Sequence, residues 1–485
     1  MYAYLLVVLS SLSFVIPFLN FNLFFFSWFS LVYVINLLEK KNQNPIHLGL
    51  LFGTFSTFFG LYWMTETIHR LSGAGLIPSF VIHLAYSLYE SIFYIIIFYA
   101  LKLIIAKKTR KFYRYGFIIF LYIVLEKFFP RVFPYKLGNT QILFNELSQL
   151  VSYFGLNILS IFVLLANITI YELVFKKNIR LFYIFLIFFV GMFFSGKLLI
   201  SNYPEREIGP GTISVAVIQP DKDLEDLVNI NSAIKENTFL TIWPESSLDR
   251  VDIFNKKDSL NFRKNFARKF QIKSKFILFG SIYQNKEGYH NAAILVDEKI
   301  NIVSKYFKSK LMVFGEYYPF SAIISKIIPI YDSFVPLREG EIKPLLLNRE
   351  NKIGVVICYE DLFEENSILL SQRGSKILIN ITNDEWYGDS LASYQHLMLA
   401  IPRAIENRKY LIRSAKTGIS AIINPNGLIV KQIDMNKKGF LNEKVELLEE
   451  KSFYTKYHGL INWFYYIILV FFLGTFFYKL RKSGH

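Results

Sequence analysis

The sequence has one cysteine, little charge and no recognisable metal-binding motif. Because Cys358 is the only cysteine among 485 residues, an internal disulfide and a cysteine-based metal cluster are both excluded. The seven histidines are scattered, and none shows the spacing of a metal-binding pair such as HExxH. Internal repeats and low-complexity linkers are also missing. The cysteine and histidine pattern therefore predicts no structural or catalytic metal.

Charged residues make up only 19% of the chain, whereas hydrophobic residues make up 53%, with 49 phenylalanines and 31 tyrosines. This composition is too apolar for a soluble protein and indicates membrane spans. The net charge of +16 would suit nucleic-acid binding. However, the basic residues of the N-terminal half lie in short loops between apolar runs, which favours a membrane and argues against a nucleic-acid partner.

Eight apolar runs are long enough to cross a hydrocarbon core of about 30 Å. They lie at residues 2–19, 21–38, 46–64, 78–104, 113–129, 147–171, 181–200 and 460–479. The first run lacks a basic start and a small-residue cleavage site, so we expect a retained span and not a signal peptide. The boundary between the first two runs, near residues 20–22, is the least defined.

Loop charges predict the orientation of these spans. Lysine and arginine gather in the loops at 40–41, 102–114 and 176–180 and in the tail at 479–482, and are sparser in the alternate loops. Since basic loops stay in the cytoplasm, both termini are predicted to be cytoplasmic, which requires an even number of spans. We expect a transmembrane domain at 1–200 with seven spans, an extracytoplasmic domain at 201–458, and a last span with a cytoplasmic tail at 459–485.

The segment 201–458 is predicted to be one α/β domain. Candidate strands are 212–218, 239–243, 276–282, 292–296, 352–357, 377–381, 410–414 and 419–423. Helical patterns lie between several of them, for example at 261–270 and 390–407. Strands that alternate with helices indicate a layered α/β fold, and the strand pairs without an intervening helix suggest mixed pairing.

Two polar side chains follow predicted strands, where open α/β sheets place their chemistry, and a third precedes an apolar segment. Cys358 follows the β-branched run 355–357, Glu245 follows 239–243, and Lys308 precedes the segment 311–316. A thiol nucleophile needs a base and a positive group for the oxyanion, which these residues could supply. Taken singly, each has a plainer explanation: a small buried cysteine, a first-turn acid of a helix, and a solvated basic edge beside Lys305 and Lys310.

Taken together, these residues match a known pattern. WPES at Glu245, YxK and LxxFGE at Lys308 and Glu316, and CYED at Cys358 resemble the Glu–Lys–Cys triad of the nitrilase superfamily in order and spacing. Within that superfamily the sequence is most similar to its membrane-bound branch, the apolipoprotein N-acyltransferases. Further matching stretches lie at 383–389, 395–396, 403–406 and 417–420, and in the membrane half at 62–63, 78, 126–134 and 149–160.

The resemblance implies a multi-pass helical membrane domain with a nitrilase-like α-β-β-α sandwich. It implies Cys358 as the nucleophile, Glu245 as the general base and Lys308 as the group that stabilises the oxyanion. It also marks four supporting positions: Glu316, Tyr359, Glu360 and Trp386. Glu316 is expected to pair with Lys308 and keep it charged, and Glu360 to orient backbone groups. Trp386 would be either a wall for an acyl chain or ordinary core.

The implied function is acyl transfer from a membrane phospholipid to the N-terminal amine of a diacylglyceryl-modified apolipoprotein. The implied reaction passes through a thioester and needs no cofactor, and the implied enzyme is a monomer of the bacterial inner membrane. Two rivals remain open. A membrane-tethered amidase or hydrolase would use the same triad, and a non-enzymatic transporter or scaffold would retain the fold. Charges inside the spans would favour a transporter, but the spans are nearly free of charge, with Glu90 and Glu172 as the main exceptions.

Some positions depart from the family pattern. Val313 stands where the family usually has proline, Lys416 stands where it usually has asparagine, and the stretch Gln219–Trp243 is short. The aromatic, proline-containing segment 313–337 is expected to lie at the membrane interface, anchored by Tyr317 and Tyr318, although it could fold into the core instead.

Overall fold

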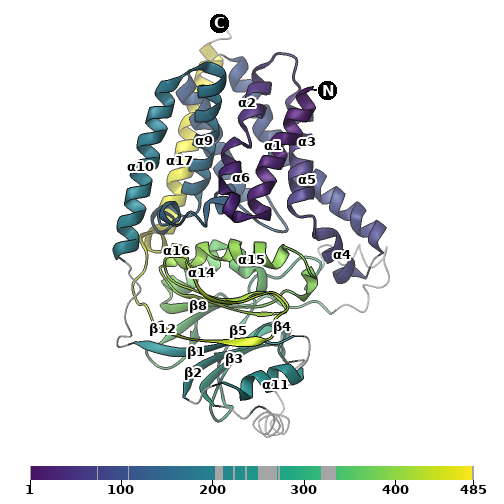
Figure 1. Cartoon of the computed structure of the whole chain (residues 1–485), viewed down its shortest axis with the longest axis vertical. Coiled ribbons are helices and arrows are strands. Elements are labelled where there is room, and N and C mark those ends of the chain that lie inside the picture. Colours follow the sequence, from purple (N-terminus) through teal and green to yellow (C-terminus); the bar gives the residue numbers. More distant parts are fainter. Residues whose placement is uncertain are drawn as a thin grey trace. The chain divides into compact units, whose positions relative to one another are not determined.

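The computed structural model describes residues 2–73, 75–107, 109–202, 211–221, 224–234, 237–248, 270, 273–317 and 335–482. The chain forms two compact units (Figure 1). The helical unit comprises Met1–His69, Gly73–Asn202 and Lys456–His485, and the sheet unit comprises Arg70–Ser72 and Tyr203–Thr455.

The long apolar runs of the helical unit form helices, since a helix satisfies its own backbone hydrogen bonds in lipid. In chain order they are α1 (Tyr2–Leu19), η1 (Phe21–Phe29), α2 (Val32–Glu39), α3 (Pro45–Gly60), α4 (Met64–Ser72), α5 (Leu76–Ala106), α6 (Lys111–Phe128), η2 (Leu137–Gln141), α7 (Asn145–Ser148), α8 (Val151–Phe154), α9 (Asn157–Lys176), α10 (Ile179–Asn202) and α17 (Phe453–Lys482). Within this unit, α1 begins and α17 ends at the same end (Figure 1).

A multi-pass helical domain was predicted and is confirmed, with fewer clear spans than eight. Among the described residues, six segments are long and apolar enough to cross a membrane: Tyr2–Leu19, Phe21–Glu39, Leu76–Ala106, Asn157–Lys176, Ile179–Asn202 and Phe453–Thr475. The pair α3 and α4, bent by 65°, would make a seventh. The predicted span at 113–129 is α6, whose 18 residues include the charged side chains of Lys111, Arg114, Glu126 and Lys127.

Three buried acidic side chains of the helical unit, Glu90, Glu126 and Glu172, have basic or polar partners. Glu90 lies 3.1 Å from the Arg131 guanidinium, and both are buried. Glu172 pairs with Lys111 of α6. Glu126 accepts hydrogen bonds from the backbone N–H of Leu137 (2.6 Å) and from the Ser160 hydroxyl (2.9 Å). Since a buried charge is tolerated when it is paired, these contacts account for acids inside the unit without a transport pathway.

The sheet unit contains two six-stranded sheets. The first has the order β12-β1-β2-β3-β4-β5 and the second the order β11-β10-β9-β8-β7-β6. The strands are β1 (Thr212–Gln219), β2 (Thr238–Ile242), β3 (Ser274–Asn285), β4 (Gly288–Asp297), β5 (Ile302–Phe307), β6 (Leu345–Leu346), β7 (Lys352–Ile357), β8 (Ser375–Asn383), β9 (Leu411–Lys416), β10 (Ser420–Ile423), β11 (Ile429–Ile433) and β12 (Gly439–Glu446). Each sheet has three parallel strands flanked by antiparallel ones.

The two sheets pack face to face around one apolar core. Side chains of β1 and β2, such as Val215 and Ile242, meet side chains of β7 and β8, such as Val355 and Ile379, and all are fully or almost fully buried. Helix α11 (Leu224–Ser232) covers the other face of the first sheet. Helices α14 (Glu364–Gln372), α15 (Ala392–Ala400) and α16 (Pro402–Asn407) lie along the second (Figure 1). The α-β-β-α sandwich is therefore confirmed.

The structure corrects several details of the sequence prediction. The mixed pairing is divided between two sheets, and β5, β6, β11 and β12 were not predicted. The helix expected at 390–407 is interrupted at Pro402, whose ring cannot continue the hydrogen bonding of α15. Apart from Phe270, the helix expected at 261–270 lies outside the described residues.

Two segments that the sequence analysis singled out, Gln219–Trp243 and 313–337, are partly described. The short stretch Gln219–Trp243 holds helix α11. Of the segment 313–337, residues 318–334, including Tyr318, lie outside the described residues. In its described part, Val313 and Tyr317 form an isolated β-bridge, and Phe314 is half exposed. The interfacial role of this segment stays a prediction.

Candidate active site

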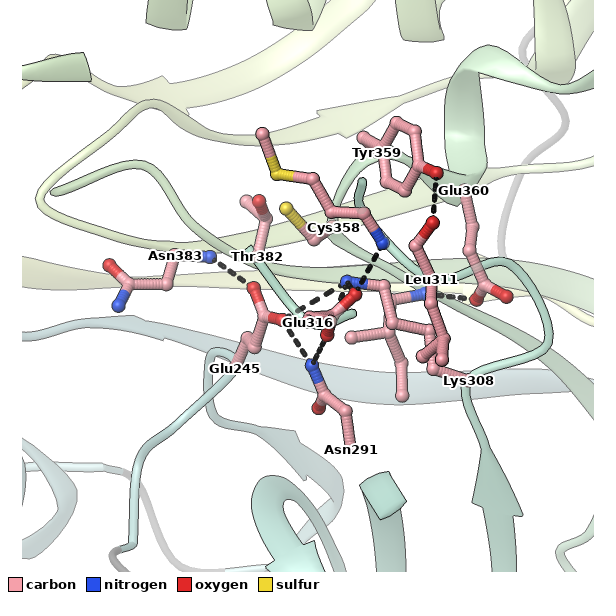
Figure 2. Close-up of polar contacts among 12 residues, drawn as sticks. Glu245, Asn291, Lys308, Leu311, Glu316, Cys358, Tyr359, Glu360, Thr382 and Asn383 are labelled. Carbon is pink, nitrogen blue, oxygen red and sulfur yellow. Dashed lines mark hydrogen bonds and ion pairs between the residues drawn. The ribbon is translucent and has the colours of Figure 1, made fainter. Parts of the chain in front are cut away.

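Glu245, Lys308 and Cys358 lie together, each just past the end of a strand. Glu245 follows β2 and Lys308 follows β5 of the first sheet, whereas Cys358 follows β7 of the second. The three residues are 6%, 1% and 7% exposed, respectively. Figure 2 shows their side chains grouped in one place. The edges of the two sheets thus bring a thiol, a carboxylate and an ammonium group into one buried site.

Lys308 is held between two carboxylates. Its Nζ lies 3.0 Å from Glu316 and 3.6 Å from Glu245 Oε1. The Asn291 side-chain amide donates one hydrogen bond to Glu245 Oε1 and one to Glu316 Oε1, each 2.7 Å long (Figure 2). Glu245 Oε2 accepts a further bond of 2.8 Å from the backbone N–H of Asn383. These contacts fix the position of the Glu245 carboxylate.

Asn291 is the residue of this group that sequence reasoning missed. It lies in β4, directly before the apolar run 292–296 that predicted the strand. The sequence signal that could have indicated Asn291 was a polar residue at the start of an apolar strand. Its partners come from other parts of the chain, so spacing gave no reason to choose it.

The site holds its thiol protonated and its ammonium group charged. Burial, and then the charge of Glu245, raise the pKa of Cys358, and Lys308 opposes them. Burial also raises the pKa of Glu245, again against the effect of Lys308. Burial alone would lower the pKa of Lys308. The carboxylates of Glu316 and Glu245 outweigh this effect and raise the pKa of Lys308 well above its usual value. A neutral thiol beside a buried carboxylate needs that carboxylate, or another base, to become a nucleophile.

The backbone at Cys358 is strained. Its φ angle is +54°, in the left-handed region, where strand β7 turns into the short 3-10 helix η4 (Cys358–Leu362). A non-glycine residue held there costs about 1 kcal/mol or more, which surrounding contacts must offset. This turn places the thiol past the strand end.

Glu360 supplies some of those contacts. Its fully buried carboxylate accepts hydrogen bonds from the backbone N–H groups of Ile357 (2.8 Å), Ser309 (2.7 Å) and Lys310 (3.0 Å), and from the Tyr306 hydroxyl. One side chain therefore joins the turn that carries Cys358 to the loop that carries Lys308.

The two aromatic positions lie in different environments. Tyr359 is buried, its hydroxyl donates to the Leu311 carbonyl, and its ring centroid lies 5.6 Å from Lys308 Nζ. Trp386, in the 3-10 helix η5 (Glu385–Tyr387), is 44% exposed. Ordinary core packing is therefore wrong for Trp386, and a lipid-facing role stays a prediction.

The atypical Lys416 also has identifiable contacts. Its Nζ lies 3.8 Å from Glu385, and its backbone carbonyl accepts the N–H groups of Asp384 and Gly418. The two hydrogen bonds to the Lys416 carbonyl do not depend on the side chain. Lysine can therefore replace the usual asparagine at this position without loss of these bonds.

Gly280 allows the Glu245 loop to approach strand β3. A Cβ at this position would lie 2.6 Å from the Glu245 Cα, and the Gly280 carbonyl accepts the N–H groups of Ser247 and Leu248. Since backbone atoms cannot move aside cheaply, we expect Gly280→Ala to destabilise the protein by about 1–3 kcal/mol. Chemical denaturation measures this loss.

Gly439→Ala, in β12 of the same sheet, is the matched control. An added Cβ there would meet its nearest neighbour, Ile433, at an ordinary 3.9 Å. Equal midpoints for wild type and Gly280→Ala would contradict the steric argument.

Two family models match the chain. The model for Carbon-nitrogen hydrolase matches residues 219–449. The model for the Apolipoprotein N-acyltransferase N-terminal domain matches residues 10–169. Both halves of the chain, sheet unit and helical unit, are therefore matched.

Curated relatives match the chain over different lengths, two of them over about nine-tenths of it. An apolipoprotein N-acyltransferase of Wigglesworthia glossinidia brevipalpis is 27% identical, covering 91% of each chain. One from Rickettsia typhi is 28% identical over 90% of each. One from Geobacter metallireducens is 33% identical over 46% of this chain and 43% of its own. Among solved structures, Saccharomyces cerevisiae Nit3, a nitrilase-superfamily member, has a TM-score of 0.35 at 21% identity, covering 50% of this chain and 93% of its own.

Proposed function

The chain belongs to the apolipoprotein N-acyltransferase family, and on that premise we propose that it transfers a fatty acyl chain from a membrane phospholipid to the N-terminal α-amine of a diacylglyceryl-modified apolipoprotein. The observation that carries the mechanism is the buried group of Cys358, Lys308 and Glu245 at three strand ends. A thiol, a carboxylate base and a fixed ammonium group suit acyl transfer through a thioester.

In the first half-reaction, Glu245 accepts the Cys358 proton while the sulfur attacks the ester carbonyl of the phospholipid. Lys308, charged and held by Glu316, stabilises the oxyanion that forms. The tetrahedral intermediate then expels the glycerol oxygen, which takes the proton from Glu245. Lysophospholipid leaves, and the acyl chain stays on Cys358.

In the second half-reaction, the neutral amine of the apolipoprotein attacks the thioester carbonyl. Glu245 accepts a proton from the amine, and the new oxyanion again lies beside Lys308. When the C–S bond breaks, the sulfur receives the proton, an amide has formed and the free thiol is restored. Because lysophospholipid leaves before the amine attacks, and the acyl chain stays on Cys358 between the two steps, the kinetics are ping-pong. The reaction needs no cofactor.

The supporting residues have roles that follow from their contacts. Glu316 keeps Lys308 charged and in place, and Glu360 fixes the turn at Cys358. Tyr359 lies over the Lys308 ammonium, and the exposed Trp386 is available to an acyl chain. We place the sheet unit on the extracytoplasmic side of a bacterial inner membrane, with both termini in the cytoplasm and the protein a monomer.

The test is intact-protein mass spectrometry after incubation with a phosphatidylethanolamine. We expect a mass increase of one acyl chain, localised to Cys358, which disappears when a peptide with an N-terminal diacylglyceryl-cysteine is added. The peptide should then carry the chain as an amide. Free fatty acid without acylated peptide would instead identify a membrane-tethered hydrolase, and a wild-type cysteine that stays unmodified would contradict the thioester.

A further inference from the structure

A second group of buried charges lies next to the three proposed catalytic residues, and the mechanism above gives it no role. It consists of Arg413 in β9, Asp361 in η4, Asp384 after β8, and His396 in α15. Their side chains are all fully buried. Burying four ionisable groups together is costly unless they are paired, so the arrangement calls for an explanation beyond packing.

These four side chains form a closed set of contacts. Arg413 donates from Nη1 to Asp361 (2.9 Å) and from Nη2 to Asp384 (3.1 Å). His396 lies between the same two carboxylates, with Nε2 3.0 Å from Asp361 and Nδ1 3.2 Å from Asp384. Although burial acts in the opposite direction, Arg413 and His396 lower the pKa of Asp384 to about 2, so its carboxylate is ionised at neutral pH.

One branch of this set leads to the nucleophile. Arg413 Nη1 donates a hydrogen bond of 2.6 Å to the Asn380 side-chain oxygen. This bond turns the amide nitrogen of Asn380 toward Cys358, whose carbonyl accepts a bond of 2.9 Å. Asp361 belongs to the same η4 turn as Cys358, so Arg413 holds the strained turn at two points.

The other branch leads to the base. Asp384 accepts a hydrogen bond from the Thr382 hydroxyl (3.1 Å), and the Asn383 residue between them donates its backbone N–H to Glu245. The contacts of Arg413 and His396 with Asp384 therefore also fix the end of β8. This end carries the Asn383 N–H group that orients the Glu245 carboxylate.

We propose that Arg413 is a positioning residue. Together with Asp361, Asp384 and His396, it holds the Cys358 thiol and the Glu245 carboxylate at the relative position that proton transfer between them requires. This inference rests on the proposed function for the roles of Cys358 and Glu245. Arginine suits the task because its planar fork reaches two carboxylates and an amide at once, whereas a lysine ammonium is a single point of charge.

The first test compares Arg413→Lys with Arg408→Lys. Arg408 is a matched control, because it is equally buried in the sheet unit but donates to the Pro425 carbonyl and the Asn426 side chain. We expect Arg413→Lys to slow acyl-enzyme formation at saturating phospholipid at least tenfold, with the half-saturating phospholipid concentration within twofold of wild type. Arg408→Lys should retain the rate even if both variants lose thermal stability. Equal rates for Arg413→Lys and wild type would overturn the proposal.

A charge-balanced double variant separates positioning from folding. Arg413→Gln leaves the two buried carboxylates without the guanidinium charge, and adding Asp361→Asn removes one of these negative charges, which restores the net charge of the wild-type group. The double variant should therefore recover much of the unfolding temperature lost in Arg413→Gln, while acyl-enzyme formation stays at least tenfold slow. Recovery of the rate together with the unfolding temperature would show a merely structural role.

Labelling with iodoacetamide tests the same inference without phospholipid. Because the chain has one cysteine, every labelled molecule reports Cys358. Arg413→Lys should be labelled at least tenfold more slowly than wild type, and Arg408→Lys within twofold of it. A rate for Arg413→Lys equal to or faster than wild type would overturn the inference. If this result holds while wild type forms no acyl-enzyme, the proposed function fails and the positioning network stands.

Discussion

Replacing Cys358 by serine is expected to abolish acyl transfer, with a loss of at least about 10³-fold. Serine differs from cysteine by one atom, so it should occupy the same turn at the end of β7. Its hydroxyl is a far weaker acid than a thiol, and Glu245 cannot deprotonate it effectively. The thioester also gives way to an ester, which an amine attacks more slowly. Both half-reactions therefore lose rate.

The measurement is acylation of a diacylglyceryl-cysteine peptide by purified wild type and Cys358→Ser. Thermal unfolding is the control: the transition of the variant should stay close to that of wild type, because the substitution adds no volume and leaves the Asn380 bond to the Cys358 carbonyl in place. Peptide acylation by the variant at a rate within tenfold of wild type would rule out the thiol as the nucleophile.

Glu245→Gln is expected to slow acyl-enzyme formation by about 10²–10⁴-fold, the usual contribution of a general base. Glutamine keeps the volume of the side chain but cannot accept a proton. Because burial raises the pKa of Glu245, and Lys308 opposes that effect, the wild-type carboxylate titrates above its ordinary range. The carboxylate is the active form, so the wild-type rate should rise as the pH rises through this pKa and fall as the pH drops below it.

Single-turnover acylation across a series of pH values measures both effects. Glu245→Gln should lose the acidic limb of the profile along with the rate. Glu287→Gln, in the exposed turn between β3 and β4, is the control and should keep both. An acidic limb that survives in Glu245→Gln would assign the titration to another group and remove Glu245 as the base.

The sequence predicted the strands of the sheet unit that have a strong local pattern and missed those that lack one. Strand β7 has the predicted bounds, because a β-branched run between polar residues is a strong local signal. Strand β12, with the polar sequence GFLNEKVE, was missed because its stability comes from pairing with distant β1 and not from its own pattern.

The site could be predicted in part for the same reason. Glu245 and Cys358 each follow a recognisable buried strand, and strand ends are where chemistry gathers. Asn291 and Arg413 lie inside strands, and their roles depend on side chains from distant parts of the chain, which no local pattern shows. Helix α6 shows the same limit: hydropathy predicted a membrane helix there, but it could not show that charged residues of this helix have partners elsewhere in the helical unit, as Lys111 has in Glu172.

The pairing of β1 with β12 constrains when this protein can fold. Gln219 is paired with Gly439 and Thr212 with Glu446, so the strand made first after α10 is completed by the strand made last before α17. Contacts so distant in sequence make folding slow, and an unpaired apolar strand invites association with other chains. During synthesis, β1 therefore presents an open edge until nearly the whole sheet unit has been made. A ribosome that stops before residue 439 would release a chain in which this edge of β1 is unpaired and favours aggregation. Proteolysis of the truncated chain, or its binding by a chaperone, would prevent that aggregation.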